Sequence, residues 1–189
     1  LSTGSVATME GMFQGCSALV NLNVSNFSTS NVTTMASMFQ GCTNLVGAPN
    51  STTGQNELSL SRWDTAKVQN MNSMFEGCTK LASLTLPDAN TSTGAVQYMN
   101  NMFKDCAGLQ ELNLSSFNTA SVREMQTMFS NCTSLCTIYV ASSWTTASVN
   151  VSAGMFTNCS APLVGGAKTQ WKSANPTDKT YARIDGGAG

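Results

Sequence analysis

The feature that most constrains this chain is a short motif that recurs six times. Each copy contains a Met-Phe pair, and a Cys follows each Phe by three positions. The pairs recur every 26 to 28 residues, except for one interval of 36 residues. Self-similarity at a fixed period of this length is typical of arrays in which one unit stacks on the next. We number the units one to six by their pairs: Met12-Phe13, Met38-Phe39, Met74-Phe75, Met102-Phe103, Met128-Phe129 and Met155-Phe156.

The other apolar positions of the unit are spaced like one face of a helix. A Val precedes each Met-Phe pair by six residues, and in five copies a second Met precedes it by three. The resulting pattern Val-x-x-Met-x-x-Met-Phe-x-x-Cys places apolar residues three and four apart, as on an amphipathic helix. Gly, Asn or Asp stands just before each Cys and is suited to end such a helix. We therefore expect a helix of about nine residues in each unit.

The residues after each Cys have the spacing of a short strand. Leu follows the Cys by three in five copies, and further Leu, Ile or Val residues follow at six and eight. One strand and one short helix cannot bury their own apolar faces, but stacked units can. The sequence thus predicts an α/β fold: a right-handed leucine-rich-repeat-like solenoid of about six coils, with a parallel sheet on one side and short helices on the other. Like side chains of adjacent units would then form buried columns.

Two segments interrupt or end the array. The long interval is explained by residues 47–56 (GAPNSTTGQN), whose Gly, Ser, Thr and Asn content predicts an inserted surface loop. Ser152 stands where the sixth unit is expected to have a Met. We therefore predict a repeat domain over residues 1–160 and a C-terminal capping segment over residues 161–189.

Composition excludes several classes of function. The 189 residues have a net charge of −1, only 10% charged residues and no His. The charge balance argues against a nucleic-acid partner, and the missing His removes Ser-His-Asp and Cys-His mechanisms and His-ligated zinc. The acidic residues are scattered without the spacing of a calcium loop or a glycosidase pair. We expect no enzyme activity, no cofactor and no metal site.

The seven cysteines are not arranged as a metal site. Six of them occupy one repeat position, which favours a column of buried free thiols that act as small hydrophobes. Cys136 follows Cys132 by four residues and lies outside that column. A Cys132–Cys136 disulfide and a partly exposed Cys136 thiol are both open interpretations.

No apolar run reaches the roughly 18 residues that span a membrane, so we expect no membrane insertion in this segment. The chain begins with Leu1 and has no signal peptide, which we interpret as a mature or excised segment.

The unit sequence resembles a known family. Residues 32–45 and especially residues 112–129 (LNLSSFNTASVREMQTMF) resemble the BspA-like leucine-rich-repeat family, whose units follow VxxMxxMFxGCxxLxxLxLSxFxTxxV. The resemblance covers residues 1 to about 160. It implies a bacterial protein that is secreted or exposed on the cell surface and takes part in adhesion and protein binding.

The outward positions of the predicted strands are the candidate binding surface, because the strand face of a repeat array is extended and commonly receives ligands. The candidate ligand-binding residues are Asn21, Asn23, Thr85, Glu111, Asn113 and Tyr139. We hypothesise a recognition or adhesion module that binds a host or neighbouring-cell protein or glycan.

The alternative is a structural spacer or a self-associating stalk. In an array of this kind the first unit exposes an apolar end that no other unit covers, and open ends invite end-to-end stacking.

Overall fold

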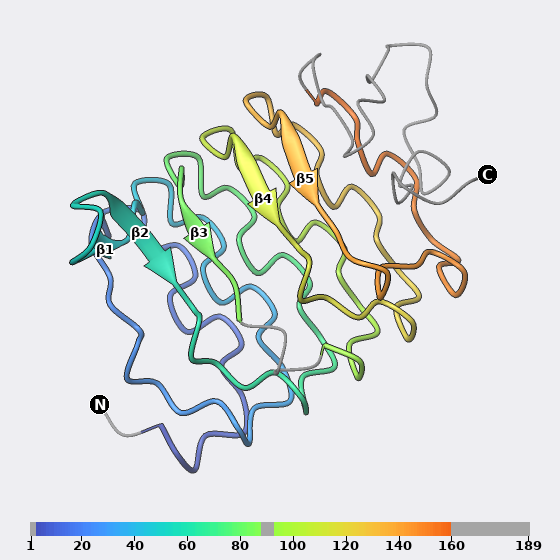
Figure 1. The fold of residues 1–189 in the computed structure, drawn as a ribbon, viewed down its shortest axis with the longest axis horizontal. Coiled ribbons are helices and arrows are strands. Elements are labelled where there is room, and N and C mark those ends of the chain that lie inside the picture. Colours follow the sequence, from blue (N-terminus) through green and yellow to red (C-terminus); the bar gives the residue numbers. More distant parts are fainter. Residues whose placement is uncertain (1–2, 88–92, 160–189) are drawn as a thin grey trace.

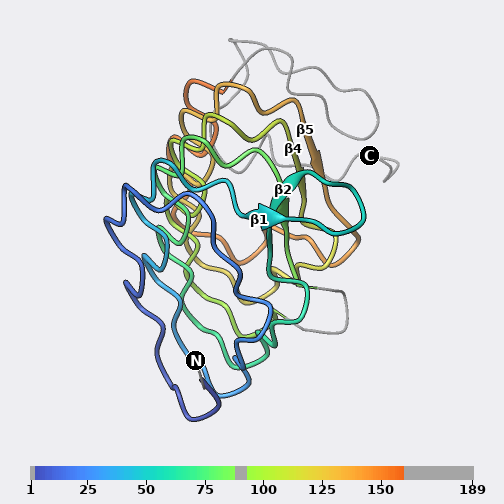
Figure 2. The same ribbon diagram turned by 90° about the vertical axis from the view of Figure 1, so that its left-hand side faces the viewer.

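The computed structural model describes residues 3–87 and 93–159. The six units lie side by side in the order of the sequence, from the N-terminal unit at one end to unit six at the other (Figure 1). The strands lie on one side of the molecule and the Met-Phe segments on the opposite side (Figure 2). The core runs between these two sides and contains the apolar repeat positions of all units.

The described part of the chain contains five short strands in two small sheets. They are β1 (Ala48–Pro49), β2 (Asn56–Ser59), β3 (Leu84–Thr85), β4 (Glu111–Asn113) and β5 (Thr137–Tyr139). In the first sheet β2 pairs antiparallel with β1 and parallel with β3, and in the second β4 pairs parallel with β5. Leu58 lies opposite Leu84, and Leu112 lies opposite Ile138. Parallel pairing therefore joins the same repeat position in consecutive units.

The predicted fold class is wrong. We expected an α/β solenoid of the leucine-rich-repeat type with a helix in each unit and one parallel sheet. The described residues contain no helix at all, and hence none long and apolar enough to cross a membrane. Their strands form two separate small sheets, one of which includes an antiparallel pair.

The helix is prevented by two residues with left-handed backbone in every unit. In unit two Ser37 has a φ of 55° and Gly41 a φ of 74°. A residue in this conformation cannot be part of a right-handed helix, and here the two lie only four residues apart. The six pairs are Gly11 and Gly15, Ser37 and Gly41, Ser73 and Gly77, Asn101 and Asp105, Thr127 and Asn131, and Gly154 and Asn158.

The backbone hydrogen bonds alternate between the unit and its neighbour. The N–H group of Gln40 turns back to the carbonyl of Ser37 at 3.1 Å, whereas the N–H group of Phe39 donates to Met74 in unit three at 2.9 Å. The same alternation recurs along units one to five. One parallel β-bridge also joins each pair of consecutive units. These bridges link the same repeat position through all six units, at Thr8, Thr34, Asn70, Tyr98, Glu124 and Val151. Consecutive units are therefore joined as parallel strands are joined, without the i to i+4 bonds of a helix.

Like side chains of adjacent units pack on one another, as the sequence predicts. The phenylalanines of the six Met-Phe pairs form one continuous stack, with ring centroids 5.4–5.8 Å apart. Phe39 and Phe75 keep this spacing, at 5.5 Å, although the chain between them contains the insertion. The parallel rings suit an offset stacking arrangement at the separation that strand pairing sets.

The cysteine column is buried in units two to six, and there its thiols bond to the backbone. The Sγ atom of Cys78 lies 3.2 Å from the carbonyl oxygen of Phe39 in the preceding unit. Cys42, Cys106, Cys132 and Cys159 repeat this contact at 3.0–3.1 Å. All seven cysteines are free. The prediction of a column of buried free thiols is confirmed for units two to six but is wrong for Cys16 of unit one, which is exposed, and Cys132 and Cys136 are not bonded to each other.

Thiol reactivity should distinguish the five buried thiols of units two to six from the two accessible cysteines. Burial raises the pKa of Cys42 to about 11 and that of Cys159 to about 12, which leaves almost no thiolate at neutral pH. We expect an Ellman titration of the native protein to modify only the exposed Cys16 and the half-buried Cys136. All seven thiols should react once denaturant has unfolded the chain. Rapid modification of more than two thiols in the native protein would contradict this packing.

Candidate binding face

The structure gathers part of the predicted site on the outward face of the strands. Asn113 on β4 lies opposite Tyr139 on β5, and Glu111 lies opposite Thr137, so these side chains are neighbours. Tyr139 is 47% exposed, although it is a large aromatic residue. We call the outward side chains of units one to five on this side the strand face. They include Asn21, Asn23, Glu57, Ser59, Thr85, Glu111, Asn113 and Tyr139.

The remaining predicted residues are placed differently. Asn21 and Asn23 are exposed in unit one, outside any strand. Thr85 is half-buried at the end of β3, and its hydroxyl donates to a carboxylate oxygen of Glu57. The structure thus brings Glu111, Asn113 and Tyr139 together and leaves Asn21 and Asn23 at the other end of the face.

Two asparagines of the face are oriented in the same way. The Oδ1 atom of Asn23 accepts the N–H group of Ser25 at 3.0 Å, and that of Asn113 accepts the N–H group of Ser115 at 3.0 Å. This local bond fixes each amide. Neither Nδ2 group donates to any group among residues 3–87 and 93–159. Each asparagine therefore presents a fixed amide donor to solvent.

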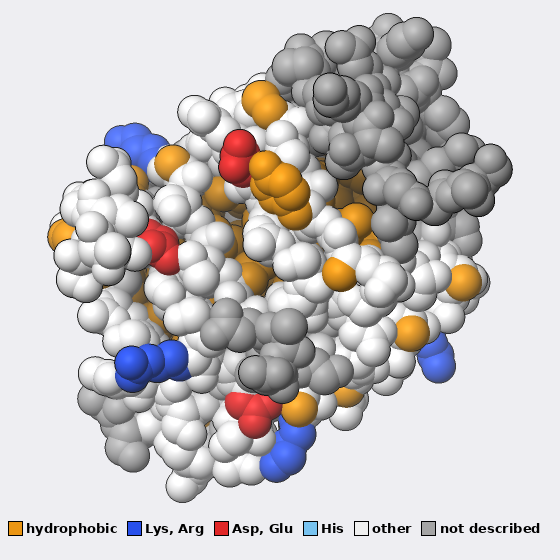
Figure 3. Space-filling model, in the orientation of Figure 1, with side chains coloured by type: hydrophobic (Ala, Val, Ile, Leu, Met, Phe, Trp, Pro, Cys, Tyr) orange, Lys and Arg blue, Asp and Glu red, His pale blue; other side chains and the backbone are white. Residues whose placement is uncertain are grey.

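The face is polar but carries little charge. Figure 3 shows mostly uncharged side chains and backbone there, with few acidic or basic groups. An uncharged surface with hydroxyl and amide groups recognises ligands through hydrogen bonds more than through long-range attraction.

The inserted residues 47–56 form a wall beside unit one. Ala48 and Pro49 on β1 pair with Glu57 and Asn56 at the start of β2, which makes a hairpin where the sequence predicts only a loop. An open cleft of about 300 Å³ lies between this hairpin and unit one. It is lined by Asn23, Ser25, Pro49, Asn50, Glu57 and Ser59. Of the predicted ligand-binding residues, only Asn23 lies in this cleft.

Glu57 holds the hairpin in place. Its carboxylate accepts the Nδ2 group of Asn50 at 2.6 Å and the hydroxyl of Thr85 on β3. Asn50 also caps its own turn, since its Oδ1 atom accepts the N–H groups of Thr52 at 2.8 Å and Thr53 at 3.2 Å. Asn50 is not among the predicted site residues, although an Asn that opens a Ser-Thr-Thr-Gly turn is a recognisable signal.

Gly47 is required where the hairpin leaves unit two. Its φ is 89°, and a Cβ atom built there would lie 2.1 Å from the carbonyl carbon of Glu57. Backbone at that distance cannot move aside without breaking the pairing of β1 with β2.

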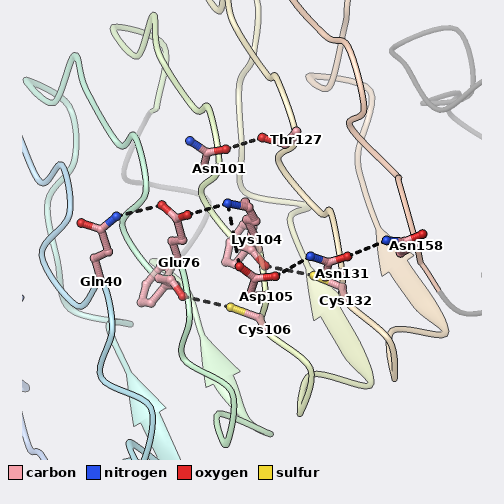
Figure 4. A network of polar contacts seen from close by, with 12 residues as sticks. Gln40, Glu76, Asn101, Lys104, Asp105, Cys106, Thr127, Asn131, Cys132 and Asn158 are labelled. Carbon is pink, nitrogen blue, oxygen red and sulfur yellow. Dashed lines mark hydrogen bonds and ion pairs between the residues drawn. The ribbon is translucent and has the colours of Figure 1, made fainter. Parts of the chain in front are cut away.

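A second polar cluster, on the Met-Phe segments, links units two to six (Figure 4). Glu76 accepts the Nε2 group of Gln40 at 2.8 Å and the Nζ group of Lys104 at 2.9 Å. Beyond Lys104 the cluster continues with Nδ2 of Asn131 donating to Asp105 at 2.6 Å and Nδ2 of Asn158 donating to Asn131 at 2.9 Å. These groups bond to one another across unit boundaries, which indicates a structural role.

The electrostatics of Glu76 follow from these contacts. Partial burial raises the pKa of Glu76, but hydrogen bonds from Lys104, Ser73 and Gln40 outweigh burial and hold the pKa below its usual range. The hydrogen bond to Glu76 in turn raises the pKa of Lys104. Within the described ranges no cluster of three or more acidic or Cys side chains could hold a metal ion.

Comparison with known proteins gives one family. The model described as "Mycoplasma protein of unknown function, DUF285" matches residues 1–82 and 43–171, and the chain therefore belongs to this family. No curated protein and no solved structure matches the chain. The family description carries no activity, and the resemblance to BspA-like proteins stays a prediction.

Substitution of Gly47 should disrupt the hairpin. We expect Gly47→Ala to lower the free energy of unfolding by more than about 3 kcal/mol or to detach the hairpin, because its Cβ would overlap backbone. Gly54→Ala is the matched control, since Gly54 has a φ of 70° and open space around its Cβ position. Gly54→Ala should lower the free energy of unfolding by only about 1 kcal/mol. Urea unfolding of both variants measures the difference, and equal losses would contradict the assigned contact.

The Glu76 network should make stability depend on pH in one direction. The pKa of Glu76 is lowered in the folded state. The stability that its carboxylate contributes is therefore fully present above the pKa of the unfolded state, about 4.3, and is lost as the pH falls through the lower pKa of the folded state. At pH 7 we expect Glu76→Gln to destabilise the protein by about 1 kcal/mol, and the difference from wild type should shrink toward about pH 3. Glu10→Gln, at an exposed position, is the control in urea unfolding. A difference that stays constant with pH would contradict the network.

Proposed function

We propose that this member of the DUF285 family is a non-enzymatic recognition module that binds a neutral glycan on its strand face. The observation that carries the proposal is the cleft of about 300 Å³ between the inserted hairpin and unit one. It opens onto the strand face, where Asn23 and Asn113 present fixed amide donors and Tyr139 an exposed ring. The hairpin supports this role, because it projects beside unit one and forms a concave cleft on an otherwise regular surface.

The chemistry of the face favours a glycan over a protein partner. Sugar hydroxyl groups both donate and accept hydrogen bonds, as do the Asn amides and Ser and Thr hydroxyls of the face. A sugar ring can also stack on an aromatic side chain such as Tyr139. Protein interfaces usually depend on several buried aromatic or Arg anchors. The strand face offers one such residue, so a protein ligand is the second choice.

The setting of the proposed activity comes from the resemblance to BspA-like proteins. We place the module outside the cell or on a bacterial cell surface, where it contributes to adhesion to a host or neighbouring cell. Nucleic acid is an unsuitable ligand, because the net charge of −1 provides no basic surface for phosphate groups.

A binding screen with four variants tests the proposal. The protein is screened against an array of neutral and acidic glycans and against extracellular matrix proteins, and hits are quantified by titration. We expect a neutral glycan to bind, and Asn23→Ala, Asn113→Ala and Tyr139→Ala to weaken it roughly five- to tenfold each, the loss of one hydrogen bond or ring contact. Asn150→Ala, a change at an exposed asparagine outside the strand face, should leave affinity unchanged.

Two results would overturn the assignment. Binding of a ligand that ignores all three strand-face changes would show that the face is wrong. Selective binding of a matrix protein with no glycan bound would show that the ligand class is wrong.

A further inference from the structure

Two repeat positions on either side of the Val of each unit create an open hollow that shares no residue with the strand face. Its volume is about 380 Å³. The residue just before that Val is small in units four to six, whereas unit three has Lys67 there. The residue just after it has a long side chain in units three to five. The hollow is lined by Gln69, Ala95, Gln97, Ser121, Arg123 and Ser148.

The backbone fixes the points from which the long side chains of this hollow project. The N–H group of Arg123 donates to the carbonyl of Gln97 at 2.9 Å, and the N–H group of Gln97 donates to the carbonyl of Gln69 at 2.9 Å. Neighbours in this row are therefore separated by the spacing of bonded strands, roughly 5 Å. Two carboxamides and one guanidinium group consequently project from adjacent points around one hollow.

Arg123 supplies a positive charge that no acidic side chain pairs with among residues 3–87 and 93–159. The ion pairs in this part of the chain are made by Lys104. Glu124 is next to Arg123 in the sequence, but it is half-buried and its carboxylate accepts the Nδ2 group of Asn100 at 2.6 Å. The residues that line the hollow include no acid. The exposed guanidinium group therefore keeps its N–H donors available to a ligand.

Further donors belong to the small residues of the hollow. The backbone N–H groups of Ala95, Ser121 and Ser148 have no acceptor within the described ranges, and the two Ser hydroxyls make no hydrogen bond there. The carboxamides of both Gln residues are equally without a partner in that part of the chain. The cluster around Glu76 differs, because its polar side chains bond to one another across unit boundaries. The polar groups of the hollow therefore do not join units and are available for recognition.

We propose that this hollow binds a sugar that carries a carboxylate, with the carboxylate held by Arg123. A guanidinium group binds a carboxylate through two parallel N–H···O bonds. The single positive charge of the hollow matches the single negative charge of a carboxylate, whereas a phosphate monoester carries up to two. The Gln carboxamides and Ser hydroxyls both donate to and accept from sugar hydroxyls. The site goes beyond the neutral-glycan site proposed on the strand face, because it uses other residues and recognises charge.

Titration of the full chain with glucuronate, followed by nuclear magnetic resonance of the backbone amides, tests the proposal. Ionic strength is held constant with sodium chloride, so that screening does not change during the titration. We expect a dissociation constant of about 1 mM and the largest shifts at the amides of Ser121, Arg123 and Ser148. Glucose has the ring without the carboxylate, and acetate has the carboxylate without the ring. Each should bind about tenfold more weakly than glucuronate.

Three variants assign the binding to the hollow. Arg123→Gln removes the charge at similar length and should weaken glucuronate binding about tenfold or more. Ser121→Gln keeps Arg123 but fills the hollow, and it should weaken binding as strongly. It should also fold, because unit three has the long Lys67 at this repeat position. Arg62→Gln, at another exposed Arg that does not line the hollow, is the matched control and should bind like wild type.

Several results would overturn the proposal. They are the absence of glucuronate binding up to about 20 mM, equal binding of glucose or acetate, and tighter binding of inorganic phosphate. Unchanged affinity in Arg123→Gln or Ser121→Gln, or an equal loss in Arg62→Gln, would contradict the assigned place. The dispersion of the amide signals shows in the same spectra that each variant is folded. None of the three variants lies on the strand face, so these results are independent of the neutral-glycan site.

Discussion

The hydrogen bond from one Met-Phe segment to the next is the interaction on which the rest of the structure depends. Two left-handed residues four positions apart, such as Ser73 and Gly77, make alternate N–H groups point out of the unit. Those groups donate to the neighbouring unit at 2.8–2.9 Å, while the remaining N–H groups close turns within the unit. Nearly every backbone donor of the segment is thereby satisfied, which a buried segment without helix or long strand requires.

This bonding also sets the packing of side chains. Because each bond joins the same repeat position in two units, Phe lies on Phe, and the repeat thiol of each of units two to six reaches the Phe carbonyl of the preceding unit. Thr119 adds a similar link, since its hydroxyl donates to the carbonyl of Thr145 at 2.7 Å. The outward strand positions lie outside these buried columns. Differences between units can therefore collect there, and the hairpin beside unit one is the largest of them.

The sequence predicted the contents of the core better than the backbone that forms it. The Met-Phe and Cys spacing correctly identified which residues share a column. It could not distinguish a helix from consecutive turns, because both place apolar residues three and four apart. The left-handed backbone at Ser37 and Thr127 could not be predicted from the sequence, since Ser and Thr rarely adopt that conformation. In the candidate site, the exposure of Asn113 followed from strand alternation, and Asn23 is exposed although it lies outside any strand. The cleft did not, because it depends on tertiary contacts of Gly47 and Glu57.

Hydrogen-bond couplings measured by nuclear magnetic resonance test the central claim most directly. Such a coupling identifies the carbonyl that a given amide donates to. For the amide of Phe75 we predict a coupling to the carbonyl of Met102 in the next unit, where the N···O distance is 2.9 Å. A coupling from Phe75 to Met71 instead, four residues earlier in the same unit, would indicate a helix and would contradict the account of how the units are joined.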